Sequence, residues 1–184
     1  MLYSPEALKF VIAFLDENHI PYMVIGGLAN STWGETRATR DADFKISIDM
    51  PLAEFRKLVF DHFPERLMKI PLRMLSPYVL HIWAMPDVAA DLLVSDFDYE
   101  RQAIQRAIEI EIEGVPTCVC KAEDLIIHKA IAERSKDWSD IEGILIRQRG
   151  KLDVDYIRGW LSQFSEALEN PEILTRFNQL YQTV

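Results

Sequence analysis

The segment GGLANSTWGETRATRDAD, residues 26–43, carries the features on which our prediction of the fold depends. It opens with two of the chain's 7 glycines and closes with Asp41 and Asp43, which are separated by one residue. Two carboxylates so close together repel each other, so an opposite charge has to stabilise them. Mg²⁺ prefers carboxylate oxygens and would suit this pair. Because the D-x-D pattern is common, a solvated pair at the end of a strand is the alternative.

The residues on either side of this segment predict two strands. Residues 22–25, YMVI, form a short apolar run, and residues 28–34 are long enough for one or two helical turns. Residues 41–48, DADFKISI, alternate between apolar and polar side chains. The alternation predicts a half-buried strand whose polar face carries Asp41 and Asp43 at its start.

Gly26 and Gly27 follow the first of these strands. Glycines allow the backbone to turn sharply and allow a ligand to approach the main-chain N–H groups. A helix that begins just after them favours a phosphate at its N-terminus. The segment matches neither the dinucleotide-binding pattern G-x-G-x-x-G nor the P-loop. Glycines and aspartates together therefore predict a phosphate site that faces a metal site, and the alternative is a purely structural turn.

The rest of the pattern predicts an α+β fold with a small mixed β-sheet, followed by a helical C-terminal region. The other expected elements are helices at residues 5–18, 51–62 and within 96–107, strands at 78–84, 88–94, 108–113 and 115–119, and helices at 122–134, 138–148, 154–168 and 171–182. We therefore expect an α/β core over residues 1–120 and a helical region packed on it over residues 121–184.

The composition limits the kinds of partner. The chain has 184 residues and a formal net charge of −9, which disfavours broad, salt-driven binding of nucleic acid. Cys118 and Cys120 lack a second cluster of metal ligands, so we expect small core side chains on one strand face rather than a zinc site. No signal-peptide pattern and no apolar run long enough to span a bilayer is found in the sequence. We expect a cytoplasmic protein without a membrane partner.

The order of these features resembles the DNA polymerase β-like nucleotidyltransferases. In VIGGLANSTWGETRATRDADFKI a strand ends in Gly-Gly, a Gly-x-x-Arg-x-Thr follows, and D-x-D begins the next strand. The segment is similar to the branch of minimal and AbiEii/AbiGii-toxin-like nucleotidyltransferases. This resemblance implies transfer of a nucleotide from an NTP to an acceptor hydroxyl, with Mg²⁺ or Mn²⁺ as the cofactor. It implies that Gly26 and Gly27 hold the triphosphate and that Asp41 and Asp43 bind the metals.

The same resemblance adds two residues to the nucleotide-binding set. Many members have a serine two residues before the first aspartate, and Thr39 keeps that hydroxyl here. Arg37 matches an arginine that is common in this branch.

A third carboxylate on a later strand is implied by the superfamily, and Asp91 in AADLLVS is the best match. A lone acid within an apolar strand is costly to bury without a partner. If its strand lies beside the one that carries Asp41 and Asp43, a shared cation supplies that partner. An exposed position on an edge strand is the alternative. Asp96 and Asp98 form a second D-x-D, for which we expect helix capping because no glycine turn precedes them.

A second match lies at KAEDLIIHKAIAERSKDWSDIEGIL, residues 121–145, where the branch has a lysine, an arginine and K-D-x-x-D-I on helices. The resemblance implies that Lys129 reaches the phosphates of the NTP and that Asp137 belongs to the nucleotide site. Asp137 could equally cap the next helix. A pair of helices joined by salt bridges, with Lys129 and Glu133 at i,i+4 spacing, is the other alternative.

These observations favour a Mg²⁺-dependent nucleotidyltransferase with Asp41, Asp43 and Asp91 at its catalytic centre. The resemblance implies tRNA, a protein or a small molecule as the acceptor, and the acidic charge disfavours a large RNA. A toxin–antitoxin role, with an antitoxin as partner, follows from the branch. A non-catalytic protein of the same fold, acting as a binding or antitoxin partner, is the alternative, and a helical interaction scaffold is the third hypothesis.

Overall fold

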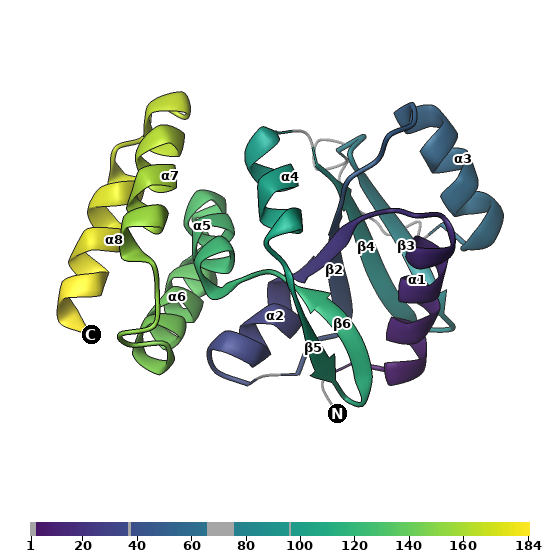
Figure 1. Ribbon diagram of the computed structural model, residues 1–184, viewed down its shortest axis with the longest axis horizontal. Coiled ribbons are helices and arrows are strands. Elements are labelled where there is room, and N and C mark those ends of the chain that lie inside the picture. The colour runs from purple at the N-terminus through teal and green to yellow at the C-terminus, as the bar shows by residue number, and fades with distance from the viewer. Residues whose placement is uncertain (1–2, 37, 66–75, 96) are drawn as a thin grey trace. The chain divides into compact units, whose positions relative to one another are not determined.

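The computed structural model describes residues 3–36, 38–65, 76–95 and 97–184 (Figure 1). The chain forms two compact units, and we describe each by itself. The first unit consists of Met1–Leu28 and Arg37–Cys120, and the second of Ala29–Thr36 and Lys121–Val184. The boundary between them falls within helix α2 (Gly26–Trp33), so residues 29–36 belong with the C-terminal helices rather than with the sheet.

The first unit is built around a mixed sheet. Its strands are β1 (Tyr22–Ile25), β2 (Asp41–Ile46), β3 (Val79–Met85), β4 (Val88–Val94), β5 (Ile108–Ile112) and β6 (Val115–Val119). The six described strands lie in the order β3-β4-β2-β1-β6-β5. The central pair β1–β2 is antiparallel, while β2–β4 and β1–β6 are parallel. The hairpins β3–β4 and β5–β6 form the two edges. The predicted α+β class with a mixed sheet is confirmed.

One face of this sheet is apolar, as the alternation of β2 predicts. Phe44 in β2 and Leu92 in β4 are buried on it, and α1 (Pro5–Glu17) packs against β3 and β6. Ser4 caps α1 by accepting a hydrogen bond from the amide of Ala7. Phe10 and Phe14 of α1 meet His62 at the end of α3 (Leu52–His62), which lies on the same side of the sheet (Figure 1). Phe14 is buried in this contact, whereas Phe10 and His62 stay exposed.

The opposite face carries the polar side chains of β2. Helix α4 (Asp98–Gln105) contacts β2 on this side, and Glu100 of α4 forms a buried ion pair with Lys45. Lys45, predicted to lie on the polar face, is therefore covered by a helix instead of exposed to solvent. Asp98 begins α4 and accepts from Arg101 at 3.0 Å, while Phe97 occupies the cap, so the expected capping by Asp98 is wrong. Asp96 lies outside the described residues.

The second unit contains the C-terminal helices. They are α5 (Ala122–Ala132), α6 (Ser135–Arg147), α7 (Val154–Ala167) and α8 (Glu172–Thr183). α5 packs against α6 and α7, and α7 packs against α8, with Ile126, Ile141 and Leu161 fully buried between them. α6 begins three residues earlier than the sequence pattern predicts. In the described part of the chain no helix has the length and apolar character that a membrane span requires.

Candidate active site

The predicted third carboxylate lies beside the second one. Because β2 and β4 pair in parallel with Asp43 opposite Asp91, the two side chains project from the same face of the sheet on neighbouring strands. Asp41 lies two residues earlier in β2 and shares that face. All three carboxylates are half-buried. The sheet thus brings together acids that are far apart in the sequence.

Gly26 lies directly against this group. β1 pairs with β2 so that Ile25 is opposite Asp43, and the chain turns at the next residue, Gly26, with φ +64°. A Cβ atom at Gly26 would lie 1.9 Å from Oδ2 of Asp43, a distance that two non-bonded atoms cannot share. Both the backbone conformation and the approach of the carboxylate therefore require glycine here. α2 starts at this residue, with no separate turn between strand and helix.

Thr39 and Gly27 form a similar contact around Asp41. Oγ1 of Thr39 lies 3.0 Å from the backbone oxygen of Asp41 and 3.1 Å from its carboxylate Oδ1. The single hydroxyl proton of Thr39 can be donated to either oxygen, and both contacts restrain Asp41 at the first position of β2. A Cβ atom at Gly27 would lie 2.8 Å from Oγ1 of Thr39. Gly26 thus lies against the acid Asp43, and Gly27 lies against Thr39, which contacts Asp41.

Asp91 has a partner that the sequence did not predict. Nδ1 of His81 in β3 lies 2.8 Å from Oδ1 of Asp91, and the two residues are opposite each other in the antiparallel pair β3–β4. When Asp91 is ionised, its carboxylate can only accept a hydrogen bond, and Nδ1 of His81 is then the donor. Asp91 therefore enters the site with an oriented carboxylate.

The charge on this strand face is negative at the end where β2 starts. Farther along the strand, Lys45 and Glu100 neutralise each other within a buried pair. Asp41, Asp43 and Asp91 share the remaining part of the face. Like-charged groups that share one strand face favour a bound cation.

The donor set fits a hard divalent cation. The three acids offer only carboxylate oxygens, which Mg²⁺ and Mn²⁺ prefer, and the bare Cα of Gly26 leaves the approach to Asp43 open. Within the ranges that the structure describes, no three His, Cys, Asp or Glu side chains are gathered as closely as a metal centre requires. The fit therefore rests on the chemistry of the donors and on their shared strand face.

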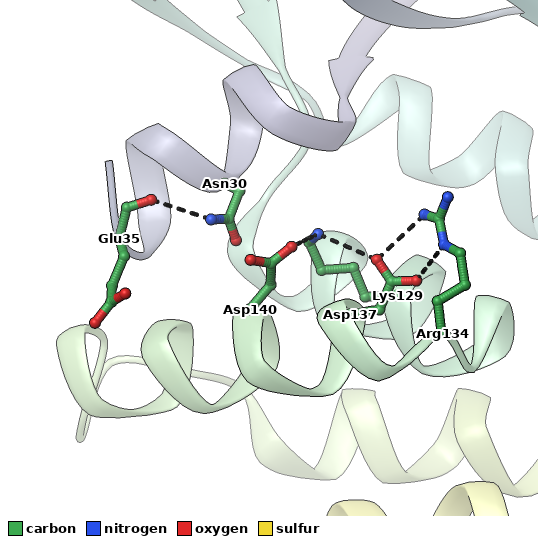
Figure 2. Close-up of polar contacts among 6 residues, drawn as sticks. All are labelled: Asn30, Glu35, Lys129, Arg134, Asp137 and Asp140. Carbon is green, nitrogen blue, oxygen red and sulfur yellow. Dashed lines mark hydrogen bonds and ion pairs between the residues drawn. The ribbon is translucent and has the colours of Figure 1, made fainter. Parts of the chain in front are cut away.

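The second unit contains a different charged cluster, which consists of Lys129, Arg134, Asp137 and Asp140 (Figure 2). Nζ of Lys129 lies 2.5 Å from Oδ2 of Asp140 and 3.6 Å from Oδ1 of Asp137. The side chain of Lys129 is only 6% exposed, and that of Asp137 is fully buried. The cluster ties α5 to the first turns of α6.

Asp137 does not cap α6, contrary to one of the alternatives. Arg134 occupies the cap position, and Asp137 lies within the first turn. The carboxylate of Asp137 accepts from Nε of Arg134 at 2.5 Å and from Nη2 at 3.2 Å. Glu133, a candidate partner for Lys129, instead accepts a hydrogen bond from Asn170 at 2.9 Å. The helices are joined by ion pairs, but through the acids of α6.

The predicted site residues thus fall into two groups. Gly26, Gly27, Thr39, Asp41, Asp43 and Asp91 lie together in the first unit. Lys129 and Asp137 lie together in the second unit, where the amide of Asn30 also donates to the backbone oxygen of Glu35 at 3.1 Å (Figure 2). Arg37 lies outside the described residues. His81 is the addition that the structure makes.

The family of the chain follows from a comparison with known proteins. The family described as "Nucleotidyl transferase of unknown function (DUF2204)" matches residues 4–179. The chain belongs to this nucleotidyl transferase family. The match includes both units and every predicted site residue, so the superfamily expected from the glycine and D-x-D pattern is confirmed. The finer assignment to the AbiEii/AbiGii-toxin-like branch stays a prediction.

Solved structures share the fold of this nucleotidyl transferase. The antibiotic-resistance factor ANT(2'')-Ia aligns with a TM-score of 0.59 and 19% identity, over 89% of this chain and 93% of its own. A nucleotidyltransferase-like antigen from Paracoccidioides brasiliensis gives 0.56 and 18%, over 96% and 94%. The lincosamide adenylyltransferase LnuA, with lincomycin bound, gives 0.52 and 12%, over 78% and 98%. A search of the curated protein sequences found no match.

Proposed function

We propose that this protein transfers a nucleotide from an NTP to an acceptor hydroxyl, with Mg²⁺ as its cofactor and Mn²⁺ as a substitute. One observation carries the proposal: Asp43 and Asp91 stand in register on neighbouring parallel strands, against the bare Cα of Gly26. An acidic face next to a strand–glycine–helix junction suits a nucleotide and its cation. Asp41, Asp43 and Asp91 would hold the cation, and Gly26 and Gly27 would lie against the phosphates.

A bound divalent cation would offset the charge of the triphosphate and of the leaving pyrophosphate. The protein's own contribution is to hold the acceptor hydroxyl and the α-phosphate in a reactive orientation. Gly26 and Gly27 have no side chains, so a phosphate could approach the backbone at the start of α2. The dipole of this helix favours an anion there. The hydroxyl of Thr39 contacts the carboxylate of Asp41 and restrains its orientation.

The reaction conserves atoms and charge in a simple way. The acceptor oxygen forms a bond to the α-phosphorus of the NTP, and the bond from that phosphorus to the bridging oxygen of the pyrophosphate breaks. The proton of the acceptor hydroxyl passes to a carboxylate or to water. The products are a nucleotidylated acceptor and pyrophosphate, so transfer can be followed by either product.

Lys129 is not included in this phosphate site. Its ammonium group already contacts Asp140 and Asp137, and its side chain is nearly inaccessible to solvent. A lysine that binds phosphates has to give up such partners, and a buried carboxylate that loses its cation is costly. The nucleotide-binding roles of Lys129 and Asp137 therefore stay predictions from the resemblance.

A small molecule with a hydroxyl group is the first acceptor class to test. The net charge of −9 disfavours a large RNA, since phosphate-rich partners need a basic surface. Two of the proteins that share the fold are described in complexes with small molecules: adenylyl-2''-tobramycin in ANT(2'')-Ia and lincomycin in LnuA. The tRNA and protein acceptors of the toxin-like branch, and an antitoxin partner, are the further classes that the resemblance implies.

The first test separates nucleotide binding from transfer. Thermal denaturation with each NTP and Mg²⁺ should show stabilisation that is lost in the double variant Asp41→Ala/Asp43→Ala. Incubation with α-labelled NTPs and fractionated metabolites, RNA and protein should then label one fraction and release pyrophosphate. Binding without any labelled fraction would favour the non-catalytic alternative. An absence of both, with Mg²⁺ and with Mn²⁺, would overturn the proposal.

A further inference from the structure

We propose that His81 is a positioning residue for the catalytic centre, because it fixes the orientation of the Asp91 carboxylate. This inference rests on the proposed function and assigns a role to a residue outside the predicted site. Nδ1 of His81 lies 2.8 Å from Oδ1 of Asp91, and the two side chains are 17% and 15% exposed. A partly buried, charge-assisted hydrogen bond of this length restrains both groups.

The pairing of the strands places the imidazole there by a local irregularity. Next to the turn, Met85 is opposite Val88, but the register shifts between Trp83 and Met85. If the Met85–Val88 pairing continued along both strands, Ile82 would be opposite Asp91. The shift brings His81 to that place instead. A bulge re-aims side chains at the cost of a regular ladder, so its presence beside an acid of the site is consistent with a specific use.

The hydrogen bond determines the direction of both oxygens of Asp91. When Nδ1 of His81 holds Oδ1, rotation about the Cβ–Cγ bond of Asp91 is restricted, and Oδ2 is oriented with it. Thr39 has a comparable contact with Asp41, whose Oδ1 lies 3.1 Å from the threonine hydroxyl. The outer acids of the site thus each have a neighbour that orients the carboxylate. Groups that orient the ligands of a metal typically change its affinity or the activity by about 10- to 100-fold when they are removed.

Substitutions that imitate one ring nitrogen at a time can test the role of Nδ1. The amide nitrogen of asparagine is attached to Cγ, as Nδ1 of histidine is, so His81→Asn retains a donor near the position of Nδ1. Glutamine carries its amide one carbon farther out, near the position of Nε2, so His81→Gln removes the contact with Asp91. His81→Leu removes both donors and retains the apolar volume. The variants His81→Asn and His81→Gln both carry an amide group, and they differ only in how far this group lies from the backbone.

The main readout is the concentration of Mn²⁺ or Mg²⁺ that gives half of the thermal stabilisation by a non-hydrolysable ATP analogue. We expect His81→Asn to remain within about 3-fold of the original protein, and His81→Gln and His81→Leu to need about 10- to 100-fold more cation. Transfer should follow the same order, with kcat affected more than KM for the nucleotide at saturating cation. The midpoint of unfolding without cation shows whether each variant is folded.

A double variant separates positioning from general damage. In the background of Asp91→Asn, the change His81→Gln should have little further effect on the cation requirement, because the two residues act as one unit. Equal cation requirements for His81→Gln and the original protein would overturn the role of His81 while the proposed function stands. Additive effects in the double variant would overturn it as well. If the original protein shows no cation-dependent nucleotide binding, the proposed function fails and this inference fails with it.

Discussion

The two charged clusters of this protein differ in how their charges are balanced. On the strand face of the first unit, Asp41, Asp43 and Asp91 lie together, and the nearby Lys45 is already paired with Glu100. In the second unit, two cations and two acids form a neutral, largely buried cluster around Lys129. A cluster whose opposite charges are paired needs no ligand, whereas carboxylates that share one strand face favour a bound cation. The glycine and aspartate pattern pointed to the first cluster, whereas the resemblance alone assigned the second cluster to the nucleotide, and the ion pairs of Lys129 set that cluster apart.

The largest effect is expected for Asp43→Asn. Because Asp43 lies between the other acids and Gly26, its loss should lower the rate of transfer by about 100-fold or more, equivalent to several kcal/mol of transition-state stabilisation. The midpoint of unfolding without cation shows whether the variant is folded. Pyrophosphate release and thermal denaturation measure the two quantities. Asp49→Asn, at an exposed position after β2, is the control and should retain activity; equal losses in both variants would contradict the site.

The opposite pattern is expected for Lys129→Met. This change leaves the fully buried Asp137 and the nearby Asp140 without their lysine, and breaking a buried ion pair from one side costs about 3–5 kcal/mol. Chemical denaturation should show that loss of stability, and thermal denaturation a fall of about 10 °C. Lys57→Met, which removes an exposed ion pair with Asp61, should leave the midpoint unchanged. A stable Lys129→Met protein that no longer binds nucleotide would show that this cluster, too, belongs to the site.

A smaller effect on stability is expected for Gly26→Ala. Gly114→Ala is the matched control, which separates backbone strain from the contact with Asp43. Gly26 and Gly114 both have positive φ, +64° and +78°, so the backbone strain of alanine at either position should cost about 1–2 kcal/mol. Only at Gly26 does the added Cβ meet Asp43; at Gly114 it meets nothing within 4 Å. Gly26→Ala should therefore also abolish the stabilisation by cation and nucleotide, which Gly114→Ala should retain. Equal ligand responses would mean that Gly26 serves the backbone alone.

The smallest effect concerns a thiol outside both clusters. Burial is the main cause that raises the pKa of Cys118 above 9.0, and it also raises the pKa of the neighbouring Tyr22 hydroxyl. A raised pKa means that the folded protein holds its proton more tightly than the unfolded chain. The associated stability is present below pH 9 and is lost as the pH rises through the folded pKa.

Alkylation of Cys118, followed by mass spectrometry, should have an apparent pKa above that of an unfolded control peptide. Cys120 is fully buried and should react only after unfolding. The rate should not respond to Mg²⁺ and NTP at constant pH, because the thiol belongs to neither charged cluster. A strong change in the alkylation rate on addition of the ligands would show that binding at the aspartates alters the environment of Cys118.

Much of the fold could be predicted because local patterns determine it. The alternation in residues 41–48 predicts the strand and its apolar face, and Ser4 before a proline predicts the start of α1. The juxtaposition of Gly26 with Asp43 was also expected, although its closeness was not. The strand and the helix start depend on neighbours in the sequence, which periodicity reveals, whereas the juxtaposition followed from the glycine and D-x-D pattern.

The contacts that the sequence did not predict depend on register and on packing. A regular hairpin around Pro86–Asp87 would place Ile82 opposite Asp91, and only the bulge brings His81 there. Lys45 follows the polar alternation of β2, yet a helix that comes much later in the chain supplies Glu100 and buries it. Asp137 has the spacing of a cap, but its carboxylate accepts from Arg134 and, because α5 packs against α6, also lies 3.6 Å from Nζ of Lys129.

The parallel pairing of β2 with β4 has a consequence for how the protein folds. Asp43 and Asp91 become neighbours only after the intervening chain, with α3 and the β3–β4 hairpin, has formed a closed loop. Such non-local pairings form slowly, because the entropy of loop closure is lost before the new contacts compensate for it. The hairpin that joins His81 to Asp91 is local and can form early. During refolding, the imidazole–carboxylate contact should therefore precede nucleotide binding, and a fragment that ends before β4 should retain no binding at all.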